Sequence, residues 1–218
     1  YLNREFDQAQ HIVDKCLELN KDFSEAFLLS AQIAYAQKNY AGAKIAIDRA
    51  LSSNFAVKTW PEYNLLSARI YSAKEDHGLA LRTLESALKL ANTTDSKPVS
   101  DYIKASIYIE LAQVHALQNH LTESNQLISD ALDIFSESDQ EGRIHIAHAK
   151  IAAERGDVDV AFRILERISS DDKNYIKAMS EMANIHLKYR HDKASFAECY
   201  EKLTATSSES VQSYLFMG

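Results

Sequence analysis

Two pairs of histidines come closest to a metal-binding pattern in this sequence. His145 and His148 are three residues apart, a spacing that places both side chains on one face of a helix. A zinc site needs at least a third protein ligand, and none follows them at a suitable spacing. His186 and His191 lie on either side of an expected turn. We therefore interpret all four as core or groove histidines, and the sequence predicts no metal site.

The other reactive side chains fit helix capping and packing better than catalysis. Asp171 and Asp172 are neighbours in an expected turn, where carboxylates cap helix N-termini. Cys16 and Cys199, the two cysteines, are far apart and fall at expected core positions, which favours a reducing compartment over a disulfide framework. The sequence also lacks glycine-rich phosphate loops and the HExxH, CxxC and GxSxG motifs. We expect no catalytic residue and no cofactor, and hence a protein that is not an enzyme.

Binding of a protein segment is the chemistry that remains, and one set of polar residues suits it. These residues recur at the same place in successive sequence units and form a ladder with two positive charges: Gln32, Arg69, Gln113, Lys150 and Asn184. A ladder on one wall of a groove would hold a partner's helix or extended chain. Whether the five side chains line up depends on the elements that position them.

The composition predicts that those elements are helices. The 218 residues include 5 Gly and 2 Pro, far fewer than the turns of an all-β sandwich or barrel require. Apolar residues make up 46% and charged residues 25%, as in a chain that buries a core. The net charge of −7 gives no general attraction to nucleic acid or anionic membranes, and no apolar run is long enough for membrane insertion.

The chain repeats itself, with offsets of 34, 37, 44 and 37 residues between Phe6, Tyr40, His77, Leu121 and Val158. Small residues recur at fixed places in these units, and they form a packing signature: Ala9, Ala31, Ala43, Ala50, Ala68, Ala80, Ala87, Ala112, Ala131, Ala149, Ala161 and Ala183. Alanine at a helix crossing lets two backbones approach closely. Each unit is predicted to be two helices of about 14 residues, and stacked pairs bury a continuous core.

Turn-forming residues lie where this arrangement requires them. Within the units we expect turns at Lys38-Asn39, Glu75-Asp76, Gln118-Asn119, Arg155-Gly156-Asp157 and Arg190-His191-Asp192. Two insertions lengthen the connections between units. The segment from Ala91 to Asp101 is interpreted as a solvated loop, with a partner contact or phosphorylation site as the alternative. The segment from Lys58 to Pro61 includes Trp60, expected to pack against a helix end, with a partner anchor as the alternative.

The repeat resembles the tetratricopeptide repeat, a 34-residue helix–turn–helix with small residues at positions 8, 20 and 27. Residues 24–57 are the clearest copy, because Ala31, Ala43 and Ala50 occupy those three positions. The third full unit departs from the pattern, with Ser124 at position 20. The resemblance implies an all-α, right-handed superhelical solenoid whose concave wall is built from the first helices. The side chains with which chaperone-binding relatives clamp a terminal carboxylate are replaced here by Leu28, Gln32 and Leu66.

Longer stretches are similar to tetratricopeptide repeat protein 21, among them ELAQVHALQNHLTESNQLISDALDIFS, AKIAAERGDVDVAFRILERI and MANIHLKYRHDKASFAECYEKL. That family is a large subunit of intraflagellar transport complex A, which supports retrograde traffic in cilia. The resemblance implies a non-catalytic scaffold that contacts other complex A subunits in the cytoplasm, in the cilium or flagellum and at its base. The alternative is a cytosolic adaptor that binds peptide segments of its partners in the concave groove.

The repeats divide the chain into one continuous array. We expect a truncated repeat's second helix in residues 1–23, and a truncated repeat's first helix in 208–218. Between them we expect full repeats at 24–57, 58–94, 102–138, 142–172 and 175–207. Both ends then expose surfaces that a neighbouring repeat would cover, so we expect the chain to be part of a longer array.

Overall fold

The computed structural model describes residues 2–93 and 98–206. These residues fall into two compact units with the boundary between Ser124 and Asn125, and each unit is described by itself. The regular elements of the described residues are α-helices and one 3₁₀ helix. The predicted first helix in residues 208–218 lies outside the described residues.

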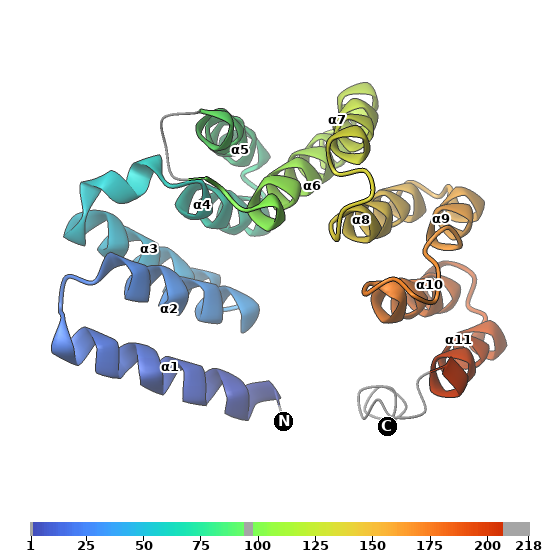
Figure 1. The fold of residues 1–218 in the computed structure, drawn as a ribbon, viewed down its shortest axis with the longest axis horizontal. Helices are drawn as coiled ribbons and strands as arrows, with labels where there is room; N and C mark the ends of the chain where they lie inside the picture. The colour runs from blue at the N-terminus through green and yellow to red at the C-terminus, as the bar shows by residue number, and fades with distance from the viewer. Residues whose placement is uncertain (1, 94–97, 207–218) are drawn as a thin grey trace. The chain divides into compact units, whose positions relative to one another are not determined.

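Unit 1 consists of helices that pack in pairs. Their bounds are α1 (Leu2–Leu19), α2 (Ser24–Ala36), α3 (Tyr40–Ser53), α4 (Pro61–Ala73), α5 (His77–Asn92) and α6 (Asp101–Leu117). Helix α2 packs against α3 and α1, and α4 packs against α5, as Figure 1 shows. The first helices also contact one another, α2 with α4 and α4 with α6. A shared surface of first helices is therefore present in this unit.

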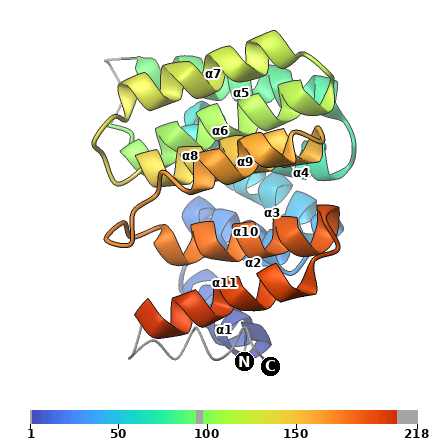
Figure 2. The same ribbon diagram turned by 90° about the vertical axis from the view of Figure 1, so that its right-hand side faces the viewer.

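Unit 2 continues the pattern. Helix α7 (Leu121–Ile134) spans the boundary, and α8 (Glu141–Glu154), α9 (Val158–Leu165), α10 (Tyr175–Tyr189) and α11 (Lys193–Thr206) follow it. Helix α8 packs against α9 and α10, and α10 packs against α11 (Figure 2). The predicted all-α fold of stacked helical hairpins is thereby confirmed in both units.

The turns inside the hairpins share one backbone conformation. One residue in each has a positive φ and stands two residues before the next helix begins: Lys38, Glu75, Asn119, Gly156 and His191. The following N–H closes the turn onto the helix behind it, as Asn39 does by donating to the Ala34 carbonyl at 2.8 Å. This is the Schellman pattern of helix ends, which usually employs glycine. Here glycine occupies it at Gly156 alone among the described turns.

The same turns also begin the next helix. The Asn39 side chain accepts from the Gly42 N–H at 2.9 Å, and the Asp76 carboxylate accepts from the Leu79 N–H at 3.1 Å. One residue thus closes the first helix and caps the second, which is how short polar turns replace Gly and Pro. Gly42 makes room for its cap, because a Cβ there would lie 2.6 Å from the Asn39 amide nitrogen.

The core runs along the small residues of the packing signature. Ala31, Ala112 and Ala183 have no exposed surface, and eight others are at most 1% exposed: Ala43, Ala50, Ala68, Ala80, Ala87, Ala131, Ala149 and Ala161. Ala9 is half-buried and packs against Val13, Ala26 and Ile33. Buried isoleucines and leucines such as Ile47, Leu84 and Ile185 fill the space around these close approaches.

Ser124 shows why one unit tolerates a departure from alanine. Its side chain is 1% exposed, and its hydroxyl donates to the Ala112 carbonyl at 2.8 Å. A buried hydroxyl with a partner avoids the penalty of an unsatisfied polar group. The hydrogen bond therefore joins α6 to α7 at a position where other units have a small alanine and no such bond, namely Ala43, Ala80 and Ala161.

The structure corrects two details. The predicted loop from Ala91 to Asp101 is shorter, because Ala91 is buried in α5 and Asp101 belongs to the first turn of α6. Helix α9 has 8 residues, and the expectation of about 14 was wrong there. After Leu165 the backbone hydrogen bonds change from the i→i−4 to the i→i−3 type, such as the bond from the Ile168 N–H to the Leu165 carbonyl at 3.1 Å. Ile168 nevertheless stays buried.

The shorter insertion forms the 3₁₀ helix η1 (Phe55–Thr59), followed by Pro61 in the first turn of α4. Trp60 is half-buried against the cluster that includes Val57 and Leu66, so the packing interpretation of Trp60 is confirmed.

Candidate partner-binding site

The ladder residues all lie on first helices: Gln32 on α2, Arg69 on α4, Gln113 on α6, Lys150 on α8 and Asn184 on α10. Gln32, Lys150 and Asn184 are exposed, whereas Arg69 and Gln113 are half-buried. Within unit 2 the structure brings Lys150 and Asn184 together at a small cavity of about 40 Å³ between α8 and α10.

Arg69 does not present a free positive charge to a partner. Its Nε donates to Glu110 Oε1 at 2.7 Å, and the two side chains are 29% and 20% exposed. Tyr35 lies beside this pair, and its pKa is raised by burial and by the Glu110 carboxylate. Of the two positive charges in the ladder, the one on Arg69 is therefore neutralised by a carboxylate of the next first helix.

Sequence reasoning did not identify Glu110. It stands 41 residues after Arg69, so no local spacing connects them. The repeat register offers a signal, because Glu110 stands three residues before the ladder residue Gln113 of the following helix. Glu181 occupies the same place before Asn184 in unit 2.

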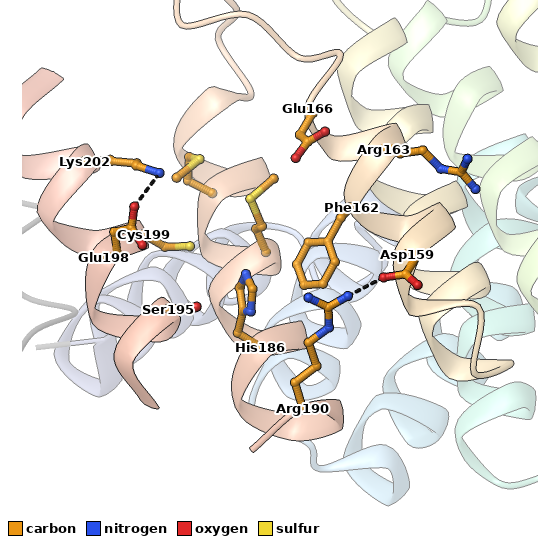
Figure 3. Close-up of a pocket in the computed structure, with 12 residues that line it drawn as sticks. Asp159, Phe162, Arg163, Glu166, His186, Arg190, Ser195, Glu198, Cys199 and Lys202 are labelled. Carbon is orange, nitrogen blue, oxygen red and sulfur yellow. Dashed lines mark hydrogen bonds and ion pairs between the residues drawn. The ribbon is translucent and has the colours of Figure 1, made fainter. Parts of the chain in front are cut away.

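A larger cavity, about 690 Å³, opens between α9, α10 and α11 (Figure 3). The Phe162 ring lies at its centre between His186, with ring centroids 4.3 Å apart, and the Arg190 guanidinium, 4.6 Å from the ring centroid. Arg190 is also paired with Asp159, and Lys202 with Glu198 at 2.9 Å. Four of the six Asp, Glu, Lys and Arg side chains that line this cavity are thus paired within the protein.

The groups in this cavity are not poised for nucleophilic catalysis. Burial raises the pKa of the Cys199 thiol, so the thiol is protonated at neutral pH rather than activated. Burial lowers the pKa of His186, and the nearby Arg190 charge lowers it further. Cys199 is 5% exposed and packs against Met179 and Ala183, in agreement with its interpretation as a packing residue.

A second cavity of about 490 Å³ lies one repeat earlier, between α7, α8 and α9. Its lining includes Asn125, His148 and Ala152, which the repeat offsets align with Phe162, Met182 and His186 of the larger cavity. Cavities at equivalent places in successive repeats are a product of helix stacking.

The remaining histidine pair is partly enclosed. The His145 side chain is 13% exposed, and its Nε2 lies 3.7 Å from Glu141 Oε1. Burial lowers the pKa of both His145 and His148. Within residues 2–93 and 98–206, no three or more His, Cys, Asp and Glu side chains gather in a metal-binding group. No helix in these ranges is both long and apolar enough to cross a membrane.

Comparison with known proteins gives the family. The model described as "Tetratricopeptide repeat protein 21 ARM repeat" matches residues 55–203, and "Tetratricopeptide repeat protein 21 second ARM domain" matches residues 1–39. The chain belongs to the tetratricopeptide repeat protein 21 family. This confirms the family resemblance of the sequence.

Two curated relatives illustrate the extent of the match. Mouse tetratricopeptide repeat protein 21A is 32% identical over 93% of this chain, and human tetratricopeptide repeat protein 21B is 30% identical over 100% of it. The chain spans 16% and 17% of the length of these two relatives.

Solved structures show the same fold at low sequence identity. PilW, a type IV pilus biogenesis factor, aligns over 99% of this chain and 92% of its own with a TM-score of 0.59 at 16% identity. Yeast Tom70 aligns over 92% of this chain and 41% of its own with a TM-score of 0.57 at 18% identity. At these identities the likeness concerns the helical repeat fold alone.

Proposed function

We propose that this chain is a non-catalytic interaction scaffold within a subunit of intraflagellar transport complex A, which supports retrograde ciliary transport and cilium assembly. The observation that carries the proposal is the family match, which extends over nearly the whole chain. The proposed partners are other protein subunits of that complex. The proposed location is the cytoplasm, the cilium or flagellum, and its base.

The fold suits a scaffold for a physical reason. Each hairpin buries its apolar side against its neighbours through alanines with almost no exposed surface. The helices are thereby held in register, and their outer surfaces remain available to partners over a long distance along the chain. Affinity would be distributed over many contacts, so most single exposed substitutions should have small effects on assembly.

The experiment is co-purification of the tagged full-length protein from ciliated cells, with identification of the bound proteins. We expect ciliary transport subunits to be recovered with the wild type. The variant Ala112→Asp should lose them, because a buried charge disrupts the stack around α6. The matched control is Ala41→Asp, the same substitution at an exposed position of α3 outside the ladder, which should retain them. A wild-type protein that recovers no ciliary transport subunit contradicts the proposal.

The second candidate function is a cytosolic adaptor that binds a peptide in the groove of first helices. Its support is the cavity that Lys150 and Asn184 line together. The same co-purification separates the two functions, because an adaptor would recover separate peptide-bearing clients in place of a stable assembly of transport subunits.

A further inference from the structure

The first helices of unit 2 carry a basic strip. Helices α8 and α10 pack against each other, and Lys150 and Asn184 line one cavity between them. Arg143 stands seven residues before Lys150, and Lys177 stands seven before Asn184. Seven residues are two helical turns, so these side chains share a face that extends about 10 Å along both helices.

Two of these cations have no counter-ion in the protein. Lys150 and Lys177 are exposed, and neither forms an ion pair with any residue in the described ranges. The Arg143 guanidinium donates to the Gln140 side chain. Lys150 and Lys177 thus carry positive charges without an ion-pair partner in a chain whose net charge is −7.

Two carboxylates lie among these side chains: Glu181 stands between Lys177 and Asn184 on one face of α10, and Glu154 follows Lys150 by one turn of α8. Glu154 and Glu181 line the same cavity as Lys150, and both also act on the Lys188 ammonium, which lies 4.8 Å from the centre of the Tyr189 ring. Arg69 in unit 1 provides the contrast, because Glu110 neutralises it at 2.7 Å. Lys150 and Glu181 hold the equivalent places in the repeat and form no such pair.

We propose that the strip of Arg143, Lys150, Lys177 and Asn184 binds an acidic segment of a partner protein. Exposed lysines without partners attract carboxylates over a distance, and the Asn184 amide adds a hydrogen-bond donor. The cavity beside them includes Ala153, Ile185 and Tyr189, which would receive a small apolar side chain between the acidic residues. This inference rests on the scaffold function and names the chemistry of one partner.

The pattern fits an acidic protein segment better than a nucleic acid. Nucleic-acid binding typically uses about 6–10 phosphate contacts, and this strip offers three cations. Glu154 and Glu181 would repel a continuous polyanion, whereas a protein segment can place a basic or polar residue opposite them.

The test is fluorescence anisotropy of a labelled peptide of about 15 residues, rich in Asp and Glu with interspersed Leu, titrated with the whole 218-residue chain. A peptide with Asn and Gln at the acidic positions is the control ligand. We expect the acidic peptide to bind, and the affinity to fall by about tenfold or more in the double variant Lys150→Glu, Lys177→Glu. The affinity for the wild type should also decrease as salt is added.

The matched control variant is Lys21→Glu, Lys74→Glu, which reverses two exposed lysines of unit 1 and changes the net charge equally. Circular dichroism verifies that both double variants are folded. Equal affinity in the two double variants, equal binding of the neutral peptide, or no binding of the acidic peptide to the folded wild type would overturn the inference. Tighter binding of single-stranded RNA or of phosphatidylserine vesicles than of the peptide would overturn the assigned partner.

Co-purification tests the scaffold function separately from peptide binding. If the wild type recovers transport subunits and Lys150→Glu, Lys177→Glu recovers the same set in the same amounts with unchanged peptide binding, only the inference fails. If the wild type recovers none, the proposed function fails.

Discussion

Residues at equivalent positions on the first helices form an ion pair in unit 1 and remain unpaired in unit 2. In unit 1, Arg69 and Glu110 form an ion pair at 2.7 Å between α4 and α6. In unit 2, Lys150 and Glu181 hold the corresponding places on α8 and α10 and line a cavity without pairing. The guanidinium is planar and holds a carboxylate in a fixed geometry, whereas an ammonium on a flexible stem remains hydrated. In unit 1 the charge of Arg69 is neutralised within the protein, whereas in unit 2 the charge of Lys150 is available to a partner.

The largest expected effect tests whether both units depend on the same packing. A charge at Ala112 in unit 1 or at Ala183 in unit 2 would be buried, because both alanines have no exposed surface. We expect Ala112→Asp and Ala183→Asp each to lower the free energy of unfolding by roughly 3–5 kcal/mol. Urea denaturation gives the totals, and hydrogen exchange locates the loss. Unchanged stability in either variant would show that the repeat register is misplaced there.

The second test concerns the ion pair itself. Arg69→Ala should lower the free energy of unfolding by about 1–2 kcal/mol, because Glu110 remains partly buried without its partner. Lys150→Ala should change it by less than about 0.5 kcal/mol. A double-mutant cycle of Arg69→Ala and Glu110→Ala isolates the pair energy, and we expect coupling of about 1 kcal/mol. Similar losses for Arg69→Ala and Lys150→Ala would erase the contrast between the units.

The turns provide a smaller difference between the units. Glu75 in unit 1 adopts φ 64°, a conformation that costs non-glycine residues energy. Glu75→Gly should therefore raise the free energy of unfolding by about 0.5–1 kcal/mol, measured by urea denaturation. Gly156→Ala in unit 2 should lose about 1 kcal/mol through its φ of 90°, since no atom lies within 4 Å of the added Cβ. Asn119→Gly is the control, with a smaller gain because Asn tolerates this conformation. A loss of stability in Glu75→Gly would contradict this explanation.

The smallest expected effect is a difference in acid sensitivity. Burial lowers the pKa of His145, His148 and His186 in unit 2 below the ordinary 6.5, while His115 shows such a shift in the described part of unit 1. The unfolded chain then binds more protons than the folded chain, so the free energy of unfolding falls as the pH drops below about 6.5. The stability that depends on these neutral histidines is fully present above that pH.

Hydrogen exchange at about pH 7.5 and about pH 5.5, corrected for the intrinsic exchange rate, should therefore show a greater loss of protection in unit 2. His148→Gln cannot gain this proton and should reduce the difference. Equal losses in the two units would mean that local packing outweighs the number of buried histidines.

The fold was predictable because its determinants are local and periodic. The alanines and the turn pairs such as Lys38-Asn39 recur at nearly constant offsets, and each hairpin needs only its neighbours. The end of α9 at Leu165 was not predictable, because the sequence after it has no break in helix-forming residues until Ser169. The position of the candidate site on the first helices was predictable from the repeat pattern. The net charge that it presents was not, because it depends on a contact between Arg69 and Glu110 across two hairpins.

The contacts between hairpins have a consequence for limited digestion. The longest tertiary hydrogen bonds and ion pairs in the described residues span about one repeat, such as Lys173 to Asp139, 34 residues away, and Arg69 to Glu110, 41 residues away. Cleavage in one connection would therefore leave every hairpin beyond the adjacent one with its own bonds intact. Brief proteolysis should therefore produce a series of stable fragments that differ in mass by whole hairpins. It should not degrade the whole chain in one step.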